Sequence, residues 1–107
     1  MMYSLESLPE REIVPGFHGR FVHSDAMTFV YWRIEPEAMI PAHSHHHEQV
    51  VNMLEGELEL IADGVARTLR AGDVFTIAGN IVHSARALTP CRVLDVFNPV
   101  REDYRPA

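Results

Sequence analysis

Four histidines lie within five positions in the segment PAHSHHHEQ, residues 41–49. Imidazole nitrogens bind divalent transition metals, so a cluster of this kind is a candidate metal centre. Side chains two positions apart on a strand point to the same face, which groups His43 with His45. Gln49 joins them if the strand continues or bends only mildly. Two histidines on one strand cannot complete a metal site, and further ligands must come from elsewhere in the chain.

His83, in the segment AGDVFTIAGNIVHS, is the best candidate for the remote ligand. It follows Gly72 by eleven residues, beyond a predicted strand and a turn. Asn80 lies in that turn and is one of the few residue types that tolerate a left-handed backbone. A barrel could bring His83 beside His43 and His45. The alternative for the whole cluster is a solvated histidine patch that binds metal only weakly.

The other histidines are expected to have different roles. For His46 and His47 we favour positions at the rim or the surface over metal ligation, although His47 has the strand parity of His43. His18 and His23 have no motif around them. We expect these two to be structural histidines whose hydrogen bonds are satisfied.

Short strands must position these side chains. Seven prolines and six glycines punctuate the chain, and no uninterrupted window keeps an apolar period of 3.6 residues. Extended and alternating segments recur instead, and Asp63-Gly64 is typical of a two-residue hairpin turn. The clearest strands are residues 30–34, 57–60, 74–77 and 92–97. Their spacing predicts an all-β sandwich or closed barrel.

The last of these strands carries a charge on an apolar face. With a period of two, Cys91, Val93, Asp95 and Phe97 point to the same side. A carboxylate is costly to bury unless it is paired, so either this face lines a polar cavity or Asp95 has a partner, most simply an arginine. We favour the cavity, because burial beside a metal and an arginine is a usual way to tune a proton-transfer group.

Arg101 lies just beyond Pro99, where its side chain could fold back over the mouth of a barrel. Its planar guanidinium is suited to binding a carboxylate at two points. The alternative is an ion pair at the surface with Glu102 or Asp103.

Length and composition limit the possible functions. The chain has 107 residues, which allows one domain with one core. A formal charge of −6 without an arginine cluster argues against nucleic-acid binding, and no apolar run approaches the ~20 residues of a membrane span. Lysine is absent, which excludes Schiff-base chemistry on a lysine amine. The single Cys91 and the lack of a signal-peptide pattern lead us to expect a cytoplasmic protein.

The spacing of the candidate ligands resembles that of the cupin superfamily over roughly residues 25–105. Its first motif is His-x-His, three residues, Glu or Gln, six residues and Gly, and its second is a Gly-Asp turn followed by a histidine. The matching residues are His43, His45, Gln49 and Gly56 in the first motif and Gly72, Asp73 and His83 in the second. Glu37 stands where the first motif usually opens with glycine, and Ala78 and Asn80 replace the usual proline and glycine of the second.

This resemblance implies a jelly-roll barrel, the double-stranded β-helix of cupins, in a single domain. Residues 1–24 would form an N-terminal arm and the first strand or strands of that domain, and residues 25–107 the cupin barrel. Cupins commonly form dimers, so we expect a homodimer of C2 symmetry.

Three segments, HSHHHEQ, VNMLEGE and DVFNPVRED, further resemble the small pectin- and alginate-degradation cupins of the KdgF type, which linearise 4,5-unsaturated monouronates. The resemblance implies a metal held by three histidines and a glutamine, here His43, His45, His83 and Gln49. It also implies active-site roles for Asp95, Phe97 and Arg101. The implied activity is the metal-dependent opening and ketonisation of a small cyclic sugar acid.

A ligand set of three imidazoles and one amide is neutral, so a divalent ion would keep close to its full charge and act as a Lewis acid. Imidazole suits Zn, Ni, Fe, Mn and Cu alike, and ligand type does not choose among them. Because cupins host many functions, two alternatives stay open. The first is a metal-dependent dioxygenase or sugar isomerase of the cupin type, and the second is a non-catalytic small-molecule-binding cupin. We expect no nucleic-acid or membrane partner.

Overall fold

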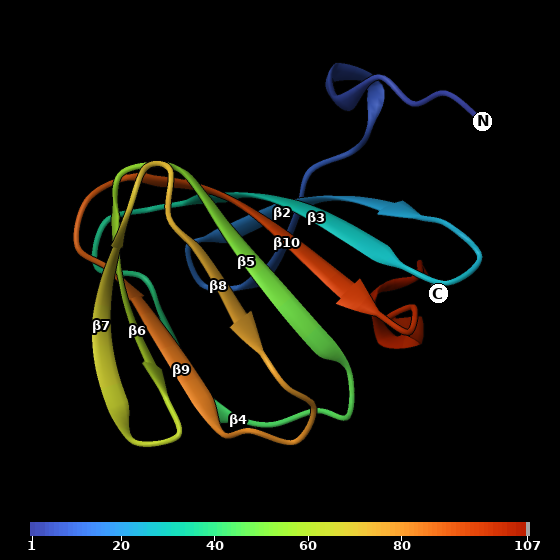
Figure 1. Cartoon of the computed structure of the whole chain (residues 1–107). Coiled ribbons are helices and arrows are strands. Elements are labelled where there is room, and N and C mark those ends of the chain that lie inside the picture. Colours follow the sequence, from blue (N-terminus) through green and yellow to red (C-terminus); the bar gives the residue numbers. More distant parts are fainter. Residues whose placement is uncertain (107) are drawn as a thin grey trace.

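Two antiparallel sheets face each other across one hydrophobic core (Figure 1). The computed structural model describes residues 1–106. In this range the strands are β1 (Arg11–Val14), β2 (Phe17–His23), β3 (Thr28–Ile34), β4 (Met39–His43), β5 (Glu48–Glu55), β6 (Glu57–Ala62), β7 (Val65–Arg70), β8 (Val74–Ile77), β9 (His83–Ala87) and β10 (Cys91–Asn98). Two short 3-10 helices, η1 (Leu5–Ser7) and η2 (Glu102–Tyr104), flank them. The all-β class predicted from the sequence is confirmed.

The order of strands brings distant parts of the sequence together. The larger sheet has the order β1-β2-β3-β10-β5-β8, and the smaller sheet has the order β4-β9-β6-β7. Within the larger sheet Phe97 is opposite Gln49, and within the smaller sheet His43 is opposite His83. The end of β10, the start of β5, the end of β4 and the start of β9 therefore contribute to one end of the barrel.

Alternation along each strand separates the core from the surface. On β10 the residues Cys91, Val93, Asp95 and Phe97 are all buried, as the period-two pattern predicted. On β3 the buried residues are Thr28, Val30, Trp32 and Ile34, and on β6 they include Leu58 and Leu60. Burial of each large apolar side chain contributes roughly 1.5–3 kcal/mol to folding. Asp95 is thus a carboxylate placed inside the core.

Turns occur where residues tolerate a left-handed backbone. Asp63 and Gly64, with φ of 51° and 77°, join β6 to β7, which confirms the predicted hairpin. Asn80 has φ of 69° in the turn between β8 and β9, as expected from its type. Glu37 also has φ of 69°, at the position where the first cupin motif, which this sequence resembles, usually opens with glycine. Gly56, with φ of 87°, lies so close to Pro90 that a Cβ atom would overlap the proline carbonyl oxygen.

The two ends of the described chain differ in their contact with the barrel. Residues 1–8 stand away from the barrel, beyond the edge where β1 and β2 extend the larger sheet (Figure 1). The segment after β10 is instead tied to the barrel. The backbone N–H of Arg101 donates to Thr28 Oγ1 at 2.8 Å, and the guanidinium of Arg11 donates to the carbonyl oxygen of Tyr104. Within residues 1–106 there is no helix with the length and apolar character to span a membrane.

Candidate metal centre and its pocket

Three histidines converge at one end of the barrel. His43 ends β4, His83 begins β9 directly opposite it, and His45 follows in the loop before β5. The ring centroids of His43 and His83 are 4.3 Å apart, and those of His45 and His83 are 4.9 Å apart. One nitrogen from each ring lies within 4.8 Å of the other two. The structure therefore brings together the three histidines that the sequence predicted as ligands.

His45 reaches this cluster from a loop, not from a strand. The sequence argument placed His43 and His45 on one continuous strand, but β4 ends at His43 and β5 begins only at Glu48. The loop is held by the turn between β8 and β9, where Asn80 N–H donates to the His45 carbonyl oxygen at 2.7 Å. Gly79 lies against His46 so closely that a Cβ would overlap its carbonyl oxygen. The turn that leads to His83 thus also positions His45.

The backbone fixes which nitrogen of each ring is free. In all three rings Nδ1 lies within hydrogen-bond distance of a carbonyl oxygen two residues away, which favours the tautomer with the proton on Nδ1. Nε2 then carries the lone pair. The distances are 2.9 Å from His43 to Pro41, 3.0 Å from His45 to His47 and 2.8 Å from His83 to Ile81.

Two further observations fit a metal ion in this position. His83 Nε2 is buried and makes no hydrogen bond to any residue in the range 1–106. Gln49 is buried, and its Oε1 lies 3.2 Å from His45 Nε2. With the proton on Nδ1 of His45, His45 Nε2 and Gln49 Oε1 both present lone pairs to each other. A cation bound between these two atoms removes their repulsion. Burial also lowers the pKa of His45 and of His83, which keeps both imidazoles neutral and able to bind a metal.

The donor set of three imidazoles and one amide oxygen fits a divalent transition ion and leaves several ions possible. It would suit calcium or magnesium poorly, since these prefer oxygen ligands. The other histidines remain outside the cluster. His46 is exposed, as expected, whereas His47 is buried and its ring lies 5.4 Å from that of His45.

The two remaining histidines have partners elsewhere in the fold. His18 Nε2 lies 2.9 Å from Glu35 Oε2, and His23 Nδ1 lies 2.8 Å from Thr28 Oγ1. The contact of His18 agrees with the structural role expected for it. The expectation that the hydrogen bonds of His23 are satisfied is met only at Nδ1, because its Nε2 is buried and has no hydrogen-bond partner within residues 1–106.

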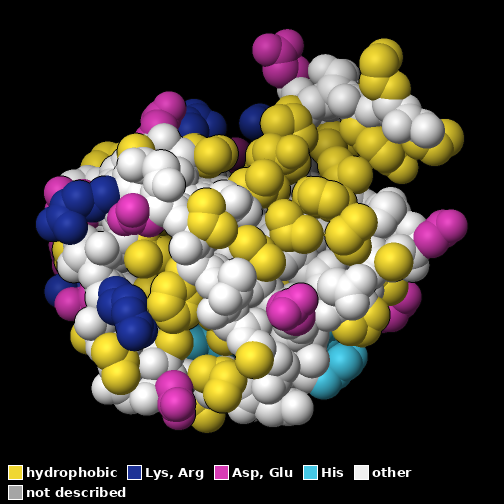
Figure 2. All heavy atoms as spheres, viewed as in Figure 1, with side chains coloured by type: hydrophobic (Ala, Val, Ile, Leu, Met, Phe, Trp, Pro, Cys, Tyr) yellow, Lys and Arg dark blue, Asp and Glu magenta, His cyan; other side chains and the backbone are white. Residues whose placement is uncertain are grey.

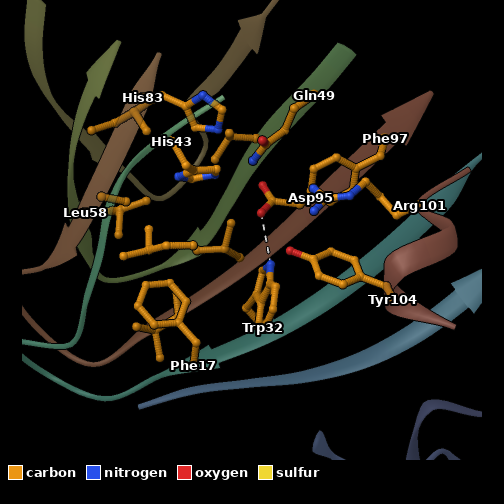
Figure 3. Close-up of a pocket in the computed structure, with 16 residues that line it drawn as sticks. Phe17, Trp32, His43, Gln49, Leu58, His83, Asp95, Phe97, Arg101 and Tyr104 are labelled. Atoms are coloured by element: carbon orange, nitrogen blue, oxygen red, sulfur yellow. Dashed lines mark hydrogen bonds between the residues drawn. The ribbon is translucent and has the colours of Figure 1, made fainter. Parts of the chain in front are cut away.

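A pocket adjoins the three histidines, with an empty volume of about 520 Å³ that includes space open to solvent. Its polar side chains gather at one end, and apolar side chains such as Phe17 and Leu58 form the opposite end (Figure 3). The residues that line it are Phe17, Trp32, Ile34, Ile40, His43, Gln49, Val51, Leu58, Leu60, His83, Ala85, Val93, Asp95, Phe97, Arg101 and Tyr104.

Asp95 is the buried carboxylate of this pocket. Its side chain is 8% exposed, and Trp32 Nε1–H donates to its Oδ2 at 2.9 Å. Among the described residues its Oδ1 has no hydrogen-bond partner. Burial raises the pKa of Asp95 to about 6, against the opposing effects of Gln49, Trp32 and the positive charge of Arg101. The arrangement corresponds to the polar cavity that the sequence favoured, and the hydrogen bond that Asp95 accepts comes from a tryptophan.

Arg101 both faces the pocket and forms an ion pair, the two alternatives that the sequence left open. Its guanidinium is paired with Asp103, with Nε 3.0 Å from Oδ1 and Nη2 2.7 Å from Oδ2, and it also lines the pocket. The guanidinium carbon lies 4.1 Å from the centre of the Tyr104 ring and 4.8 Å from that of Phe97. Because Asp103 occupies Nε and one side of Nη2, Nη1 stays free of this pair.

Two residues of the pocket were not predicted from the sequence. Trp32 contacts Asp95 from the neighbouring strand β3, and Tyr104 points its hydroxyl toward Asp95 from η2 (Figure 3). The alternation of β3 could have placed Trp32 inward. Its contact with Asp95 depends on the pairing of β3 with β10, which the sequence does not state.

Comparison with known proteins assigns the class. The cupin-domain family model matches residues 30–97, and the chain belongs to this family. Its fold, with a histidine triad at one end of the barrel, agrees with that assignment, since cupins commonly bind a metal.

More specific similarities lie within the class. The pectin degradation protein KdgF of Dickeya dadantii (strain 3937) is 28% identical over 102 residues, which cover 92% of this chain and 93% of that protein. The structure of KdgF from Halomonas sp. superposes with a TM-score of 0.92 at 26% identity, covering 98% of both chains. An RmlC-like cupin from Shewanella frigidimarina NCIMB 400 has a TM-score of 0.89 at 30% identity, covering 94% of this chain and 91% of that one. The chain is thus a cupin similar to KdgF.

Proposed function

We propose that this chain is a metal-dependent cupin enzyme that opens and ketonises 4,5-unsaturated monouronates from pectin or alginate breakdown. The similarity to KdgF over nearly the whole chain supports this substrate class. The observation that carries the proposal is the Asp95 carboxylate, which is buried in the pocket that His43 and His83 also line, and whose Oδ1 has no hydrogen-bond partner among residues 1–106. A module that only bound a ligand would have less need for such a group.

Four residues would hold the ion, namely His43, His45, His83 and Gln49. When bound, a divalent ion supplies positive charge that stabilises oxygen-centred negative charge, and the neutral ligands leave that charge nearly undiminished. Zn, Ni, Fe, Mn and Cu are all compatible with this donor set.

Arg101 and Phe97 would orient the substrate. The substrate is a cyclic uronate with a double bond between C4 and C5 and a carboxylate on C5. The Nη1 side of Arg101 is available for that carboxylate, because the Asp103 pair uses the other side. Phe97 lies beneath the Arg101 guanidinium and beside the His45 ring, with 5.7 Å between the latter ring centroids. It would pack against the sugar and exclude water.

Asp95 would move the proton. Its carboxylate takes the proton from the hydroxyl on C1, the bond between C1 and the ring oxygen breaks, and an aldehyde forms at C1. The electron pair of the broken bond remains on the former ring oxygen as an enolate. Asp95 then returns the proton to C4, and C5 becomes a ketone, so the reaction is a net isomerisation. A pKa of about 6 suits a group that must both accept and release a proton near neutral pH.

The test uses metal-loaded protein and freshly generated unsaturated galacturonate. We expect the absorbance of the C4–C5 double bond to fall faster than in the uncatalysed reaction, and the acceleration to be lost in the His43→Ala, His45→Ala double variant. Asp95→Asn should bind metal but not accelerate the reaction. Full activity of Asp95→Asn would contradict its role, whereas inactivity of the wild-type protein with each candidate metal would remove the proposed substrate. Oxygen uptake would then be measured to examine the dioxygenase alternative.

We further propose that the chain forms a homodimer through its larger sheet and N-terminal arm. Met1, Met2, Tyr3 and Leu5 on the arm are exposed. Figure 2 shows hydrophobic side chains on the arm and on the adjoining face of the barrel. A second copy would cover apolar surface that otherwise faces water. Light scattering after size exclusion should give twice the chain mass, and a monomer at micromolar concentration would contradict the proposal.

A further inference from the structure

The indole of Trp32 gives the two oxygens of Asp95 different environments. Trp32 Nε1–H donates to Asp95 Oδ2 at 2.9 Å, and the two side chains are 7% and 8% exposed. Oδ1 is buried as well, but it makes no hydrogen bond within residues 1–106. One oxygen is therefore held by Trp32, whereas the other lies near the Gln49 amide and has no hydrogen bond that fixes it.

Strand pairing sets this contact. On the adjacent strands β3 and β10, Trp32 is opposite Val93, so Asp95 is its diagonal neighbour on the inner face. Diagonal neighbours are within reach of a large aromatic side chain. The indole N–H therefore reaches the carboxylate from the side of the core, and Figure 3 shows the other oxygen directed away from Trp32.

Aromatic packing fixes the direction of the N–H group. The Trp32 ring meets Phe17 and Phe21 edge-on, with centroids 5.8 Å apart in both pairs, and Tyr104 edge-on at 6.3 Å. Such contacts favour one ring orientation over others. A rotation of the indole would break these contacts and the hydrogen bond to Asp95 together.

We propose that Trp32 is a positioning residue for proton transfer, which holds Asp95 so that Oδ1 faces the reacting end of the substrate. This inference rests on the proposed function. Without the indole N–H, the carboxylate can turn about its side-chain bonds and lose the alignment that the reaction needs. The groups proposed to bind the substrate carboxylate and the metal are unchanged, so the loss should appear in kcat and not in KM.

The first experiment compares Trp32→Phe with Phe21→Leu in the metal-loaded protein. Both variants weaken the aromatic cluster, but only Trp32→Phe removes the donor to Asp95, and Phe21 does not line the pocket. We expect Trp32→Phe to lower kcat at least about tenfold, because a hydrogen bond to a charged group is lost. KM and metal content should stay within about twofold, and Phe21→Leu, which loosens the packing around Trp32 but keeps the donor, should lower kcat by less. An unchanged kcat in Trp32→Phe, or an equal loss of kcat in Phe21→Leu, would overturn the positioning role of Trp32.

The second experiment needs no catalytic activity. Trp32 is the single tryptophan of the chain, so the fluorescence reports on the surroundings of this one indole. Excitation moves electron density in indole away from the nitrogen, and a carboxylate at the N–H group therefore shifts the emission to longer wavelength. Asp95→Leu should move the emission maximum to shorter wavelength while the circular dichroism stays unchanged. A constant maximum would overturn the Trp32–Asp95 contact even if the wild-type protein proved inactive on uronates, and a shift in an inactive protein would reject only the proposed function.

Discussion

Replacing Asp95 with asparagine should stabilise the metal-free protein while abolishing its activity. The carboxylate is buried, and its Oδ1 is left without a partner among the described residues. A residue selected only for the fold would not carry this cost, since asparagine has the same shape and accepts the same hydrogen bond from Trp32. The combination of a gain in stability with a loss of activity is the signature expected for a functional group.

The size of the effect follows from the shift in pKa. Burial raises the pKa of Asp95 from 3.8 to about 6. A shift of one unit corresponds to about 1.36 kcal/mol, so ionisation of Asp95 costs the fold about 3 kcal/mol at neutral pH. The asparagine amide group would be buried without a partner, and this cost would offset part of the stability gained by removing the charge. We therefore expect Asp95→Asn to raise the free energy of unfolding by about 1 to 3 kcal/mol.

The sign of the pH dependence provides the check. Because the folded pKa lies above the unfolded value, the wild-type protein has the full stability of a protonated Asp95 below about pH 4. It loses this stability as the pH rises through about 6. Urea unfolding of the metal-free proteins at pH 4.5, 6 and 7.5 should therefore show a gap between variant and wild type that widens with pH.

Asp103→Asn serves as the control with the opposite sign. Its pairing with Arg101 lowers the pKa of Asp103, so its contribution is present above the unfolded pKa and is lost as the pH falls through the folded value. This variant should be less stable than wild type at pH 7.5 and approach it in acid. A destabilised Asp95→Asn protein, or a gap that does not widen with pH, would refute the assignment of Asp95 as a buried, strained carboxylate.

Three further results are expected. His83→Ala should weaken metal binding by roughly a hundredfold or more, measured by competition with a chelator, because it removes one of three imidazoles. Arg101→Lys should raise KM about tenfold with a smaller change in metal content, because an ammonium lacks the planar fork that can pair with Asp103 on one side and bind a substrate carboxylate at two points on the other. An unchanged KM in steady-state assays would place the substrate elsewhere. Gly56→Ala should lower the free energy of unfolding by roughly 1–3 kcal/mol in urea, because φ there is 87° and the added methyl group meets Pro90. A Gly64→Ala control, which has a positive φ of 77° but open space around it, should lose less.

The convergence of the three histidines could be predicted because their spacing matches the two cupin motifs, whereas the geometry of a single strand does not give it. His43, His45 and His83 converge as expected, yet the strand-parity argument was wrong for His45, which lies in a loop. The loop conformation depends on a hydrogen bond from Asn80, about thirty-five residues away, and on contact with Gly79. The alternation of side chains along a strand gives no information about either of these contacts, because both come from residues far away in the sequence. The inward face of β10 was predicted correctly, because a period of two needs only the local sequence.

The surroundings of Asp95 could not be predicted in the same way. Trp32 is its diagonal neighbour only in the observed register of β3 and β10, and a shift by one residue would turn it outward. Tyr104 comes from a 3-10 turn whose position depends on contacts with Arg11 and Arg101. His47, expected at the rim, is buried instead, and its ring lies 6.5 Å from that of Phe97 on β10. Each of these placements is set by pairings between distant residues.

Charge at the mouth of the pocket suggests why Arg101 is paired and still useful. With a divalent ion bound, the ion and Arg101 carry three positive charges within a neutral ligand shell. Asp95 and Asp103 offset two of these charges at neutral pH, and one remains. A monouronate carries one carboxylate, so it would neutralise the site, whereas a neutral sugar would leave a buried positive charge uncompensated. The Asp103 pair thus reduces repulsion between Arg101 and the ion without removing the charge that would select an anionic substrate.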